Sequence, residues 1–336
     1  PILVPETDYE RQGQVPNIVF PSGAFIRNTS LYLYYGAADT TCCMAVIKTG
    51  DLTKILMQPV NRMPLLKRFA NNPIIQPDGS RAWEAKATFN AAAILLNDNV
   101  HLLYRAMSND NTSVFGYARS KDGFSIDYKS ARPAYIPREP FENKLVPGGN
   151  SGCEDPRITR IGNTLYVCYT AYNGREVPRV ALTSLSVNNF INKKWNWTAP
   201  VLISPPGIDD KDAALFPKKI NGKYAILHRI GLSIWIDFVD NLTFNGTKWI
   251  GGKILMNPRQ GERDSQKIGI AGPPIETKHG WLLIYHGISK KPDHHYHLRA
   301  ALLDIKDPTK VIARTHDPIL EPEMQYEYEG LVSHVV

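Results

Sequence analysis

The sequence NAAAILLNDNVHLLYR, from Asn90 to Arg105, has two apolar stretches on either side of Asn97-Asp98-Asn99. Asn and Asp tolerate the positive φ angles of tight turns, so this segment predicts a β-hairpin. The same pattern, in which an apolar strand, a turn and an aromatic-rich strand follow a small or polar start, occurs five times. The other four copies span Asp155–Thr170, Asp212–Arg229, Ala271–His286 and Ser22–Gly36.

Each predicted hairpin is followed by a third apolar strand and then by a Pro-flanked apolar segment. The third strands are Val114–Ala118, Val180–Leu182, Ile234–Phe238, Leu298–Leu303 and Cys42–Ile47. The Pro-flanked segments, which we expect to be the fourth strands, are Pro73–Pro77, Pro133–Pro137, Pro200–Pro205, Lys253–Pro258 and Pro318–Pro322. Four strands in each of five repeats predict an all-β fold, a five-bladed β-propeller.

The two ends of the chain resemble one another, because residues 1–13 reappear in part at residues 318–330. We therefore expect residues 1–56 to supply the blade that the C-terminal end stops short of, so that the ring closes on itself.

Composition disfavours several classes of function. The 336 residues carry a net charge of +7, and the basic residues are not gathered into runs. This pattern argues against nucleic acid or a membrane surface as a partner, while leaving room for a local anion site. The longest apolar run, Ala91–Leu96, is far shorter than the roughly 20 residues that span a bilayer, so no membrane anchor is expected. The four cysteines form no C-x-x-C motif, which favours a reducing compartment.

Equivalent positions in the repeats should face one cavity, because the first strand of every propeller blade lines the central channel. Five cations or potential cations fall at such positions, namely Arg105, Lys211, Arg229, Lys267 and His286. Like charges gathered in this way are costly unless an anion binds among them. The alternative is that each cation pairs with a neighbouring carboxylate such as Glu154, Asp212 or Asp264.

Asp155 is a candidate acid. It precedes Pro156, which restricts the backbone and suits a positioned acid, although an Asp in this context can also simply satisfy a turn. Asp209 and Asp210 are predicted to be loop residues. The His-rich segment Asp293–His297 has no second cluster to accompany it, so we predict no metal site there and a loop at the cavity rim.

Eight short motifs across nearly the whole chain are similar to those of one known family. They are Trp83–Asn90, Leu102–Arg105, Gly152–Arg157, Lys211–Pro217, Leu227–Arg229, Gly269–Pro274, Tyr285–Gly287 and Tyr34–Asp39. In these motifs the chain resembles glycoside hydrolase family 130, the inverting β-mannoside phosphorylases with a five-bladed propeller fold. The order is rotated: residues 1–56 resemble the family's C-terminal blade, and residues 57–336 resemble the remaining blades. Residues 1–336 would then form a single catalytic domain.

The resemblance implies a role for each candidate residue. Asp155 would be the general acid, acting through the 3-hydroxyl of the mannosyl unit, and Asn90, Arg105 and Asp39 would hold that mannose. Four residues match the family's phosphate-binding positions: Lys211, Arg229, Lys267 and His286. Glu154 stands where some members carry an aromatic residue, so the resemblance does not define the acceptor.

The implied chemistry is consistent with the residue types. An inverting hydrolase needs a second carboxylate to activate water. A phosphorylase needs cationic donors instead, because phosphate is itself the nucleophile. We therefore predict that a β-mannooligosaccharide and inorganic phosphate, the two binding partners, give α-D-mannose 1-phosphate and a shortened acceptor. No cofactor and no metal are expected. Within the family that the chain resembles, the segment Trp83–Lys86 is interpreted as favouring β-1,2 over β-1,4 linkages.

A cytoplasmic enzyme fits this prediction, because cytosolic phosphate is available there and the sugar phosphate is retained. The sequence leaves homo-oligomerisation open. It also leaves two other functions open: an inverting β-mannosidase on the same fold, and a propeller that binds sugar without catalysis.

Overall fold

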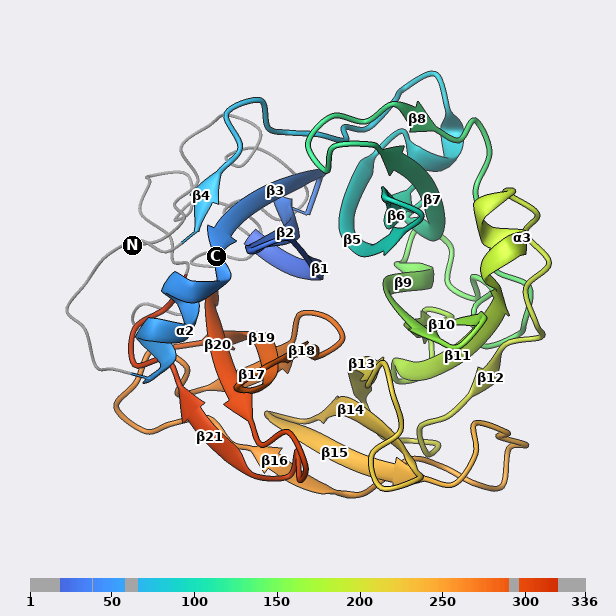
Figure 1. Ribbon diagram of the computed structural model, residues 1–336. Coiled ribbons are helices and arrows are strands. Elements are labelled where there is room, and N and C mark those ends of the chain that lie inside the picture. The colour runs from blue at the N-terminus through green and yellow to red at the C-terminus, as the bar shows by residue number, and fades with distance from the viewer. Residues whose placement is uncertain (1–18, 38, 58–65, 290–295, 320–336) are drawn as a thin grey trace.

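The computed structural model describes residues 19–37, 39–57, 66–289 and 296–319. Its strands form five antiparallel blades around a central axis (Figure 1). The prediction of an all-β, five-bladed propeller is therefore confirmed. The N- and C-terminal repeat at residues 1–13 and 318–330 lies almost entirely outside the described residues.

The first three blades are built from consecutive strands. Blade 1 contains β1 (Val19–Arg27), β2 (Ser30–Ala37), β3 (Thr41–Lys48) and β4 (Lys67–Arg68). Blade 2 contains β5 (Ala87–Leu96), β6 (Asn99–Met107), β7 (Thr112–Ser120) and β8 (Tyr128–Lys129). Blade 3 contains β9 (Ser151–Ile161), β10 (Thr164–Tyr172), β11 (Arg179–Ser186) and β12 (Val201–Leu202). A short parallel pairing of β7 with β9 joins blades 2 and 3 into one sheet.

The last two blades follow the same plan. Blade 4 contains β13 (Asp210–Leu215), β14 (Tyr224–Ile230), β15 (Ser233–Val239) and β16 (Lys253–Met256). Blade 5 contains β17 (Lys267–Ile270), β18 (Ile275–Thr277), β19 (Gly280–Ile288), β20 (Tyr296–Leu303) and β21 (Val311–Arg314). Both β17 and β18 pair with β19, and Pro273 and Pro274 separate them because proline cannot donate to the strand ladder.

Among the described residues, helices are few and short, in agreement with the sequence pattern. They are α2 (Thr49–Met57), α3 (Val187–Ile191) and the 3-10 helix η1 (Ala82–Glu84). Within the described ranges, no helix is both long and apolar enough to cross a membrane.

All five predicted hairpins form, with the turn residues in the conformations that their sequence predicts. Asn28, Asn97 and Asn221 have φ angles of 56°, 48° and 49°. The fourth strands were predicted less well. In blades 3 and 4, segments 201–202 and 253–256 are strands as predicted. In blades 1 and 2 the outer strand comes before the Pro-flanked segment in the chain. The Pro-flanked segments there form only isolated bridges, at Ile75 and Tyr135. In blade 5 the outer strand is β21, and the predicted segment Pro318–Pro322 lies outside the described residues from residue 320 onward.

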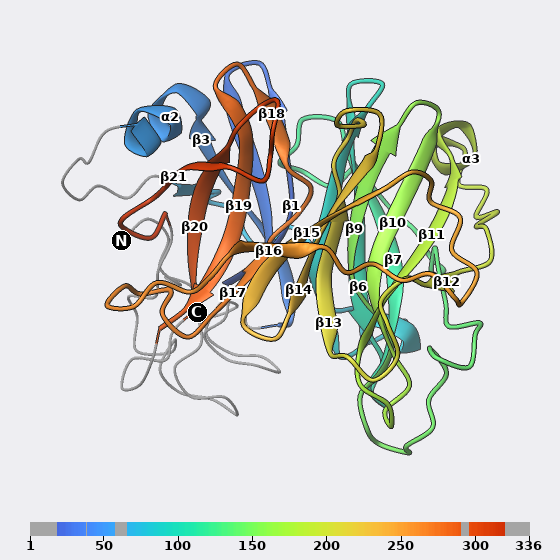
Figure 2. The ribbon, with the colours of Figure 1, turned by 90° about the horizontal axis from the view of Figure 1, so that it is seen from below.

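The hydrophobic core is divided into clusters that lie between neighbouring blades. Leu103 and Val167 belong to the cluster between blades 2 and 3, and the contacts between blades 1 and 2, 3 and 4, and 4 and 5 are similar. A further cluster joins Leu33 of blade 1 to Leu298 of blade 5. The blade from the beginning of the chain thus packs against the last one, and this contact closes the ring (Figure 2). Side chains from different blades can therefore meet at the axis.

Candidate active site

The inner strands of blades 2, 3 and 4 share a bulge that delivers the polar side chains of the site. The strand register shifts between Phe89 and Ala92 in β5, between Glu154 and Arg157 in β9, and between Lys211 and Ala214 in β13. The residues at these bulges are Asn90, Asp155 and Asp212, with φ angles of 50°, 51° and 51°. Asn and Asp are the residues other than Gly that most readily adopt this left-handed conformation. A bulge redirects the side chain of the extra residue, here toward the axis.

Asp155 is held by two donors from blade 2. Asn90 Nδ2 donates to Asp155 Oδ1 over 2.9 Å, and Arg105 Nη1 donates to the same oxygen over 3.1 Å. Among the residues that the structure describes, Oδ2 has no hydrogen-bond partner, and the Asp155 side chain keeps 15% of its surface exposed. One carboxylate oxygen is therefore fixed, whereas the other is available to a ligand.

Arg105 is itself fixed on three sides. Its Nη2 donates to Glu154 Oε1 over 2.8 Å, its Nε donates to Ser113 Oγ over 2.9 Å, and its guanidinium lies 4.7 Å from the centre of the Phe89 ring. Burial opposes the charge of Arg105, but Glu154 and Asp155 outweigh it and raise the pKa of the guanidinium. Arg105 is thus a rigid, permanently charged donor.

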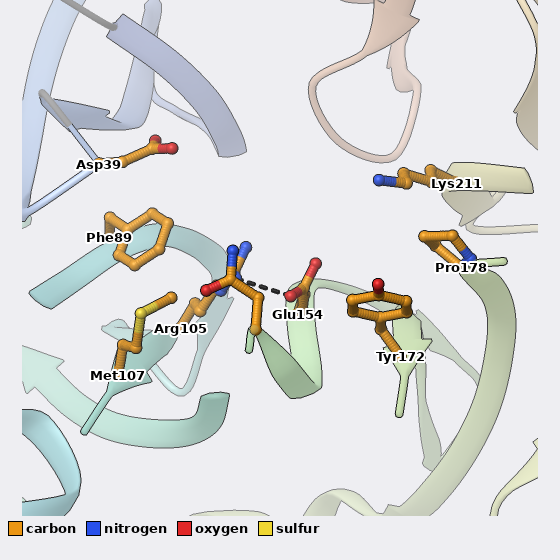
Figure 3. Close-up of a pocket in the computed structure, with 9 residues that line it drawn as sticks. Asp39, Phe89, Arg105, Met107, Glu154, Tyr172, Pro178 and Lys211 are labelled. Carbon is orange, nitrogen blue, oxygen red and sulfur yellow. Dashed lines mark hydrogen bonds and ion pairs between the residues drawn. The ribbon is translucent and has the colours of Figure 1, made fainter. Parts of the chain in front are cut away.

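A cavity of about 330 Å³ opens beside this group (Figure 3). Its lining combines charged, amide, aromatic and apolar side chains from blades 1 to 4 and their loops: Asp39, Phe89, Arg105, Met107, Asn150, Glu154, Tyr172, Pro178 and Lys211. Asp39 and Lys211 point toward each other from opposite sides. A polar cavity with aromatic and apolar walls is suited to a sugar, whose hydroxyls need partners and whose ring faces are apolar.

Two of the cavity carboxyls are shifted toward their protonated forms. Burial raises the pKa of Asp39 to about 7, although Arg105 opposes this effect. Burial also raises the pKa of Glu154, again against the influence of Arg105. Near neutral pH, Asp39 can therefore either donate or accept a hydrogen bond.

A second cluster is centred on Asp212, which is buried. Arg229 Nε donates to Asp212 Oδ2 over 2.6 Å, Arg157 Nη2 donates to Oδ1 over 3.0 Å, and His286 Nε2 lies 3.9 Å from Oδ2. Burial would raise the pKa of Asp212, but Arg229, Arg157 and His286 hold the pKa of that carboxyl far below its usual range. One permanent negative charge thus faces two arginines, and the nearby Lys267 leaves this cluster with a positive excess.

Burial determines the charge of the other two members of this cluster. It lowers the pKa of Lys267 to about 8, assisted by Arg229, and lowers the pKa of His286 to about 3, with Arg229 and Lys267 adding to the effect. The prediction counted His286 among the potential cations. With a pKa of about 3, His286 is expected to be neutral near pH 7 and to act there as a hydrogen-bonding group.

Arg157 links the two clusters. It is almost completely buried and donates to the Asp155 carbonyl over 2.9 Å, to Asp212, and to the Ile270 carbonyl over 3.2 Å. It therefore connects blades 3, 4 and 5.

The structure brings all eight predicted residues to this one region. Asn90 and Arg105 both donate to Asp155, Asp39 and Lys211 line the adjoining cavity, and Arg229 and His286 flank Asp212. The alternative that each cation pairs with a carboxylate holds for Arg105 and Arg229. Within the described part of the chain, Lys211 and Lys267 have no carboxylate within 4.0 Å, and Asp264 pairs instead with Arg259 and Arg314.

The sequence named Asp212 only as a possible charge partner for a cation, and it assigned no role to Arg157. The signal for Asp212 was present, because Asp212-Ala-Ala-Leu aligns with Asn90-Ala-Ala-Ala and Asp155-Pro-Arg-Ile. This alignment puts Asp212, and not Lys211, at the bulge. Nothing in the sequence distinguishes Arg157 from other arginines, because its role depends on partners 55 and 113 residues away.

We expect Gly269→Ala to damage the Asp212 cluster. A Cβ at this position would lie 2.5 Å from Asp212 Oδ2 and 2.6 Å from His286 Nε2, and Asp212 cannot move without breaking its bonds to Arg157 and Arg229. The expected result is a rise of about tenfold or more in the KM for an anionic substrate, as loss of a charge-assisted contact produces. Gly79→Ala is the matched control, since nothing lies within 4 Å of its Cβ. An unchanged KM in Gly269→Ala would show that the cluster binds no anion.

Comparison with known proteins identifies the family. The model of glycoside hydrolase family 130, described as beta-1,4-mannooligosaccharide phosphorylase, matches residues 1–58 and 63–336. The chain belongs to glycoside hydrolase family 130. Two relatives come from Thermoanaerobacter sp. (strain X514): a 1,2-beta-oligomannan phosphorylase, 40% identical, and a beta-1,2-mannobiose phosphorylase, 42% identical. Each match covers 81% of this chain and 87% of the relative. A beta-1,4-mannooligosaccharide phosphorylase from Ruminococcus albus is more distant, at 27% identity over 83% of this chain and 81% of the relative.

Solved structures of family 130 proteins have the same fold. The beta-1,2-mannobiose phosphorylase of Listeria innocua, in complex with beta-1,2-mannobiose, is 26% identical with a TM-score of 0.55, covering 95% of this chain and 81% of that one. A second structure, also 26% identical, has a TM-score of 0.66 and covers 80% of this chain and 84% of that one. Its description says that family 130 contains glycoside hydrolases that target beta-1,2 mannosidic linkages in Candida mannan.

Proposed function

We propose that this protein is an inverting phosphorylase of β-mannooligosaccharides that prefers β-1,2 linkages. It would convert the substrate and inorganic phosphate into α-D-mannose 1-phosphate and a shortened acceptor. The higher identity to the two β-1,2 enzymes than to the β-1,4 enzyme supports the linkage. The observation that carries the proposal is that one accessible acid, Asp155, lies beside a cluster with excess positive charge whose own carboxylate is fully engaged.

In the proposed mechanism the phosphate oxygen attacks the anomeric carbon, the bond to the leaving oxygen breaks, and that oxygen takes a proton. Asp155 would supply the proton, through the mannosyl 3-hydroxyl as the family resemblance implies. Asn90 and Arg105 hold Asp155 Oδ1, which leaves Oδ2 for this transfer. Together with Asp39, they would also bind the mannosyl hydroxyls. No metal or organic cofactor has a part in this scheme.

Lys211, Arg229, Lys267 and His286 would hold the phosphate. Arg229 is held in place by Asp212, and Lys267 lies 3.5 Å from the Tyr296 hydroxyl. Cations fixed before the reaction stabilise the developing charge without having to reorganise. Neutral His286 would add a hydrogen bond, while the cations provide the charge.

Hydrolysis is the second candidate, favoured by one specific observation. Asp39 lines the same cavity as Arg105 and Glu154, and its pKa of about 7 would allow it to accept a proton from water. The chain is also similar to a solved structure whose description mentions glycoside hydrolases that target β-1,2 mannosidic linkages, and this similarity agrees with hydrolysis. Asp212 cannot act as this base, because Arg157 and Arg229 occupy both of its oxygens and depress its basicity.

Incubation with β-1,2- and β-1,4-mannobiose, each with and without phosphate, tests the proposal. We expect mannose 1-phosphate to form in a phosphate-dependent reaction, faster from the β-1,2 substrate. Free mannose formed at the same rate without phosphate would assign the protein as a mannosidase. Binding without turnover would indicate a sugar-binding propeller.

We also propose that the protein works in the cytoplasm. A sugar phosphate formed there is retained, and the four cysteines are free and buried, as in a reducing compartment.

The pH dependence of phosphate use should follow Lys267. Its pKa of about 8 means that the ammonium is charged below that pH and loses its charge as the pH rises through it. We expect kcat/KM for phosphate to fall above about pH 8 and the fall to move to higher pH in Lys267→Arg, because a guanidinium stays protonated. Lys253→Arg, at an exposed site on β16, is the control. The same alkaline fall in wild type and Lys267→Arg would place Lys267 outside the phosphate site.

A further inference from the structure

A buried Asp–His pair lies directly behind two of the proposed phosphate ligands. Lys211 and Arg229 are register partners on β13 and β14. The residues immediately before them, Asp210 and His228, are completely buried. Successive side chains on a strand point to opposite faces, so this pair occupies the opposite face of the sheet from the two cations. Asp210 was predicted to be a loop residue, but it is the first residue of β13.

The hydrogen bonds of the pair define how many protons it holds. His228 Nε2 lies 3.0 Å from the Gly251 carbonyl oxygen, which can only accept, so this nitrogen carries a proton. His228 Nδ1 lies 2.9 Å from Asp210 Oδ2, and this contact needs a second proton on one of the two atoms. The pair therefore holds two protons and has no net charge. It stabilises the strands without neutralising Lys211 or Arg229.

The pair also connects three separate segments. The Gly251 amide donates to Asp237 Oδ2 over 2.9 Å, and Gly252, with φ of 74°, approaches β15 so closely that a Cβ would lie 2.1 Å from the Ile236 carbonyl oxygen. The Asp210 amide donates over 3.2 Å to the carbonyl of Pro178, which lines the cavity. The start of β13, the end of β14 and the Gly251 loop are therefore linked at one point.

We propose that Asp210 and His228 are positioning residues for phosphate, which hold Lys211 and Arg229 at a fixed separation on their strands. This inference rests on the proposed function. The physical reason is that Lys211, Arg229 and Lys267 repel one another when no anion is bound, which favours separation of the strands that carry them. A neutral cross-strand link opposes this separation at the site itself. Among the described residues, His228 is the only side chain that bonds the Asp210 carboxyl, through Oδ2, because the buried Oδ1 has no hydrogen-bond partner.

Two variants and their combination test the inference. Asp210→Leu is close in size but can form no hydrogen bond to His228 Nδ1, and His228→Gln keeps a donor for the Gly251 carbonyl. We expect each to raise the KM for phosphate about tenfold, while the KM for β-1,2-mannobiose changes less than about twofold. The double variant should be no worse than either single variant, because both remove the same interaction. His101→Gln, which alters another buried histidine that contacts Tyr117 at 2.8 Å, is the control for loss of stability.

The outcomes separate this inference from the proposed function. A wild-type enzyme that neither binds nor uses phosphate would overturn both. A phosphate-dependent wild type, with variants that leave the KM for phosphate unchanged or raise both KM values equally, would overturn the positioning role alone. Variants that fail to fold while His101→Gln folds would assign the pair to stability and would also overturn it.

Discussion

Asp155→Asn is expected to lower the kcat of β-1,2-mannobiose phosphorolysis by at least about 10²-fold, the contribution typical of a general acid. The amide has the same shape and can still accept hydrogen bonds from Asn90 and Arg105, but it has no acidic proton to give. The KM for mannobiose should therefore change little. Initial rates over a matrix of mannobiose and phosphate concentrations provide both parameters.

Glu154→Gln is the matched control for this variant. Glu154 is the adjacent residue, and it binds the same guanidinium over 2.8 Å. Removing the charge of Glu154 weakens its hydrogen bond with Arg105 but leaves Asp155, the proton donor, unchanged. We therefore expect kcat to fall by no more than about tenfold. If Asp155→Asn retained near-normal turnover, or if Glu154→Gln lost as much as Asp155→Asn, the assignment of the acid would be wrong.

Asp212→Asn is expected to destabilise the folded protein by about 3–5 kcal/mol, because removing one partner leaves buried charges uncompensated. Arg157 and Arg229 would both lose their carboxylate, and both are at least nine-tenths buried. Thermal unfolding at neutral pH measures the effect. Asp127→Asn is the control, since its ion pair with Arg119 lies at the surface and should contribute less than about 1 kcal/mol.

The effect of Asp212→Asn should depend on pH in a defined direction. The folded pKa of Asp212 is below its unfolded value, so the ionised carboxylate stabilises the fold above about pH 4 and this contribution is lost as the pH falls. The difference in unfolding temperature between wild type and Asp212→Asn should therefore be largest near neutral pH and shrink in acid. A difference that stays constant down to about pH 3 would contradict the ionised state of Asp212.

Much of the fold could be predicted because the same strand–turn–strand pattern occurs five times in the sequence. Hairpins such as Asn90–Arg105 combine a local turn signal with alternating strands, and both act over short distances in the chain. The outer strands were harder to place. Their pairing depends on which short segment reaches the blade edge, and in blade 1 this is Lys67–Arg68 and not the segment around Ile75.

The sequence could predict which residues form the candidate site, but it could not predict the hydrogen bonds that join them. Asp155, Asn90 and the cations were predicted to share one site, because they occupy equivalent positions in the repeats and match the motifs of the family. It could not show that Arg157 bridges the acid and Asp212, because that contact exists only once three blades are assembled. Nor could it predict that burial leaves His286 neutral, since desolvation depends on the packing of Phe20 and Tyr296 around it.

The central claim is that phosphate, and not water, attacks the mannoside. The most direct measurement follows β-1,2-mannobiose and inorganic phosphate by ³¹P and ¹H NMR from the start of the reaction. The account predicts that a new phosphate resonance and the H1 signal of α-D-mannose 1-phosphate grow together with one equivalent of free mannose, and that nothing forms without phosphate. Release of two equivalents of mannose at a rate that phosphate does not change would contradict it.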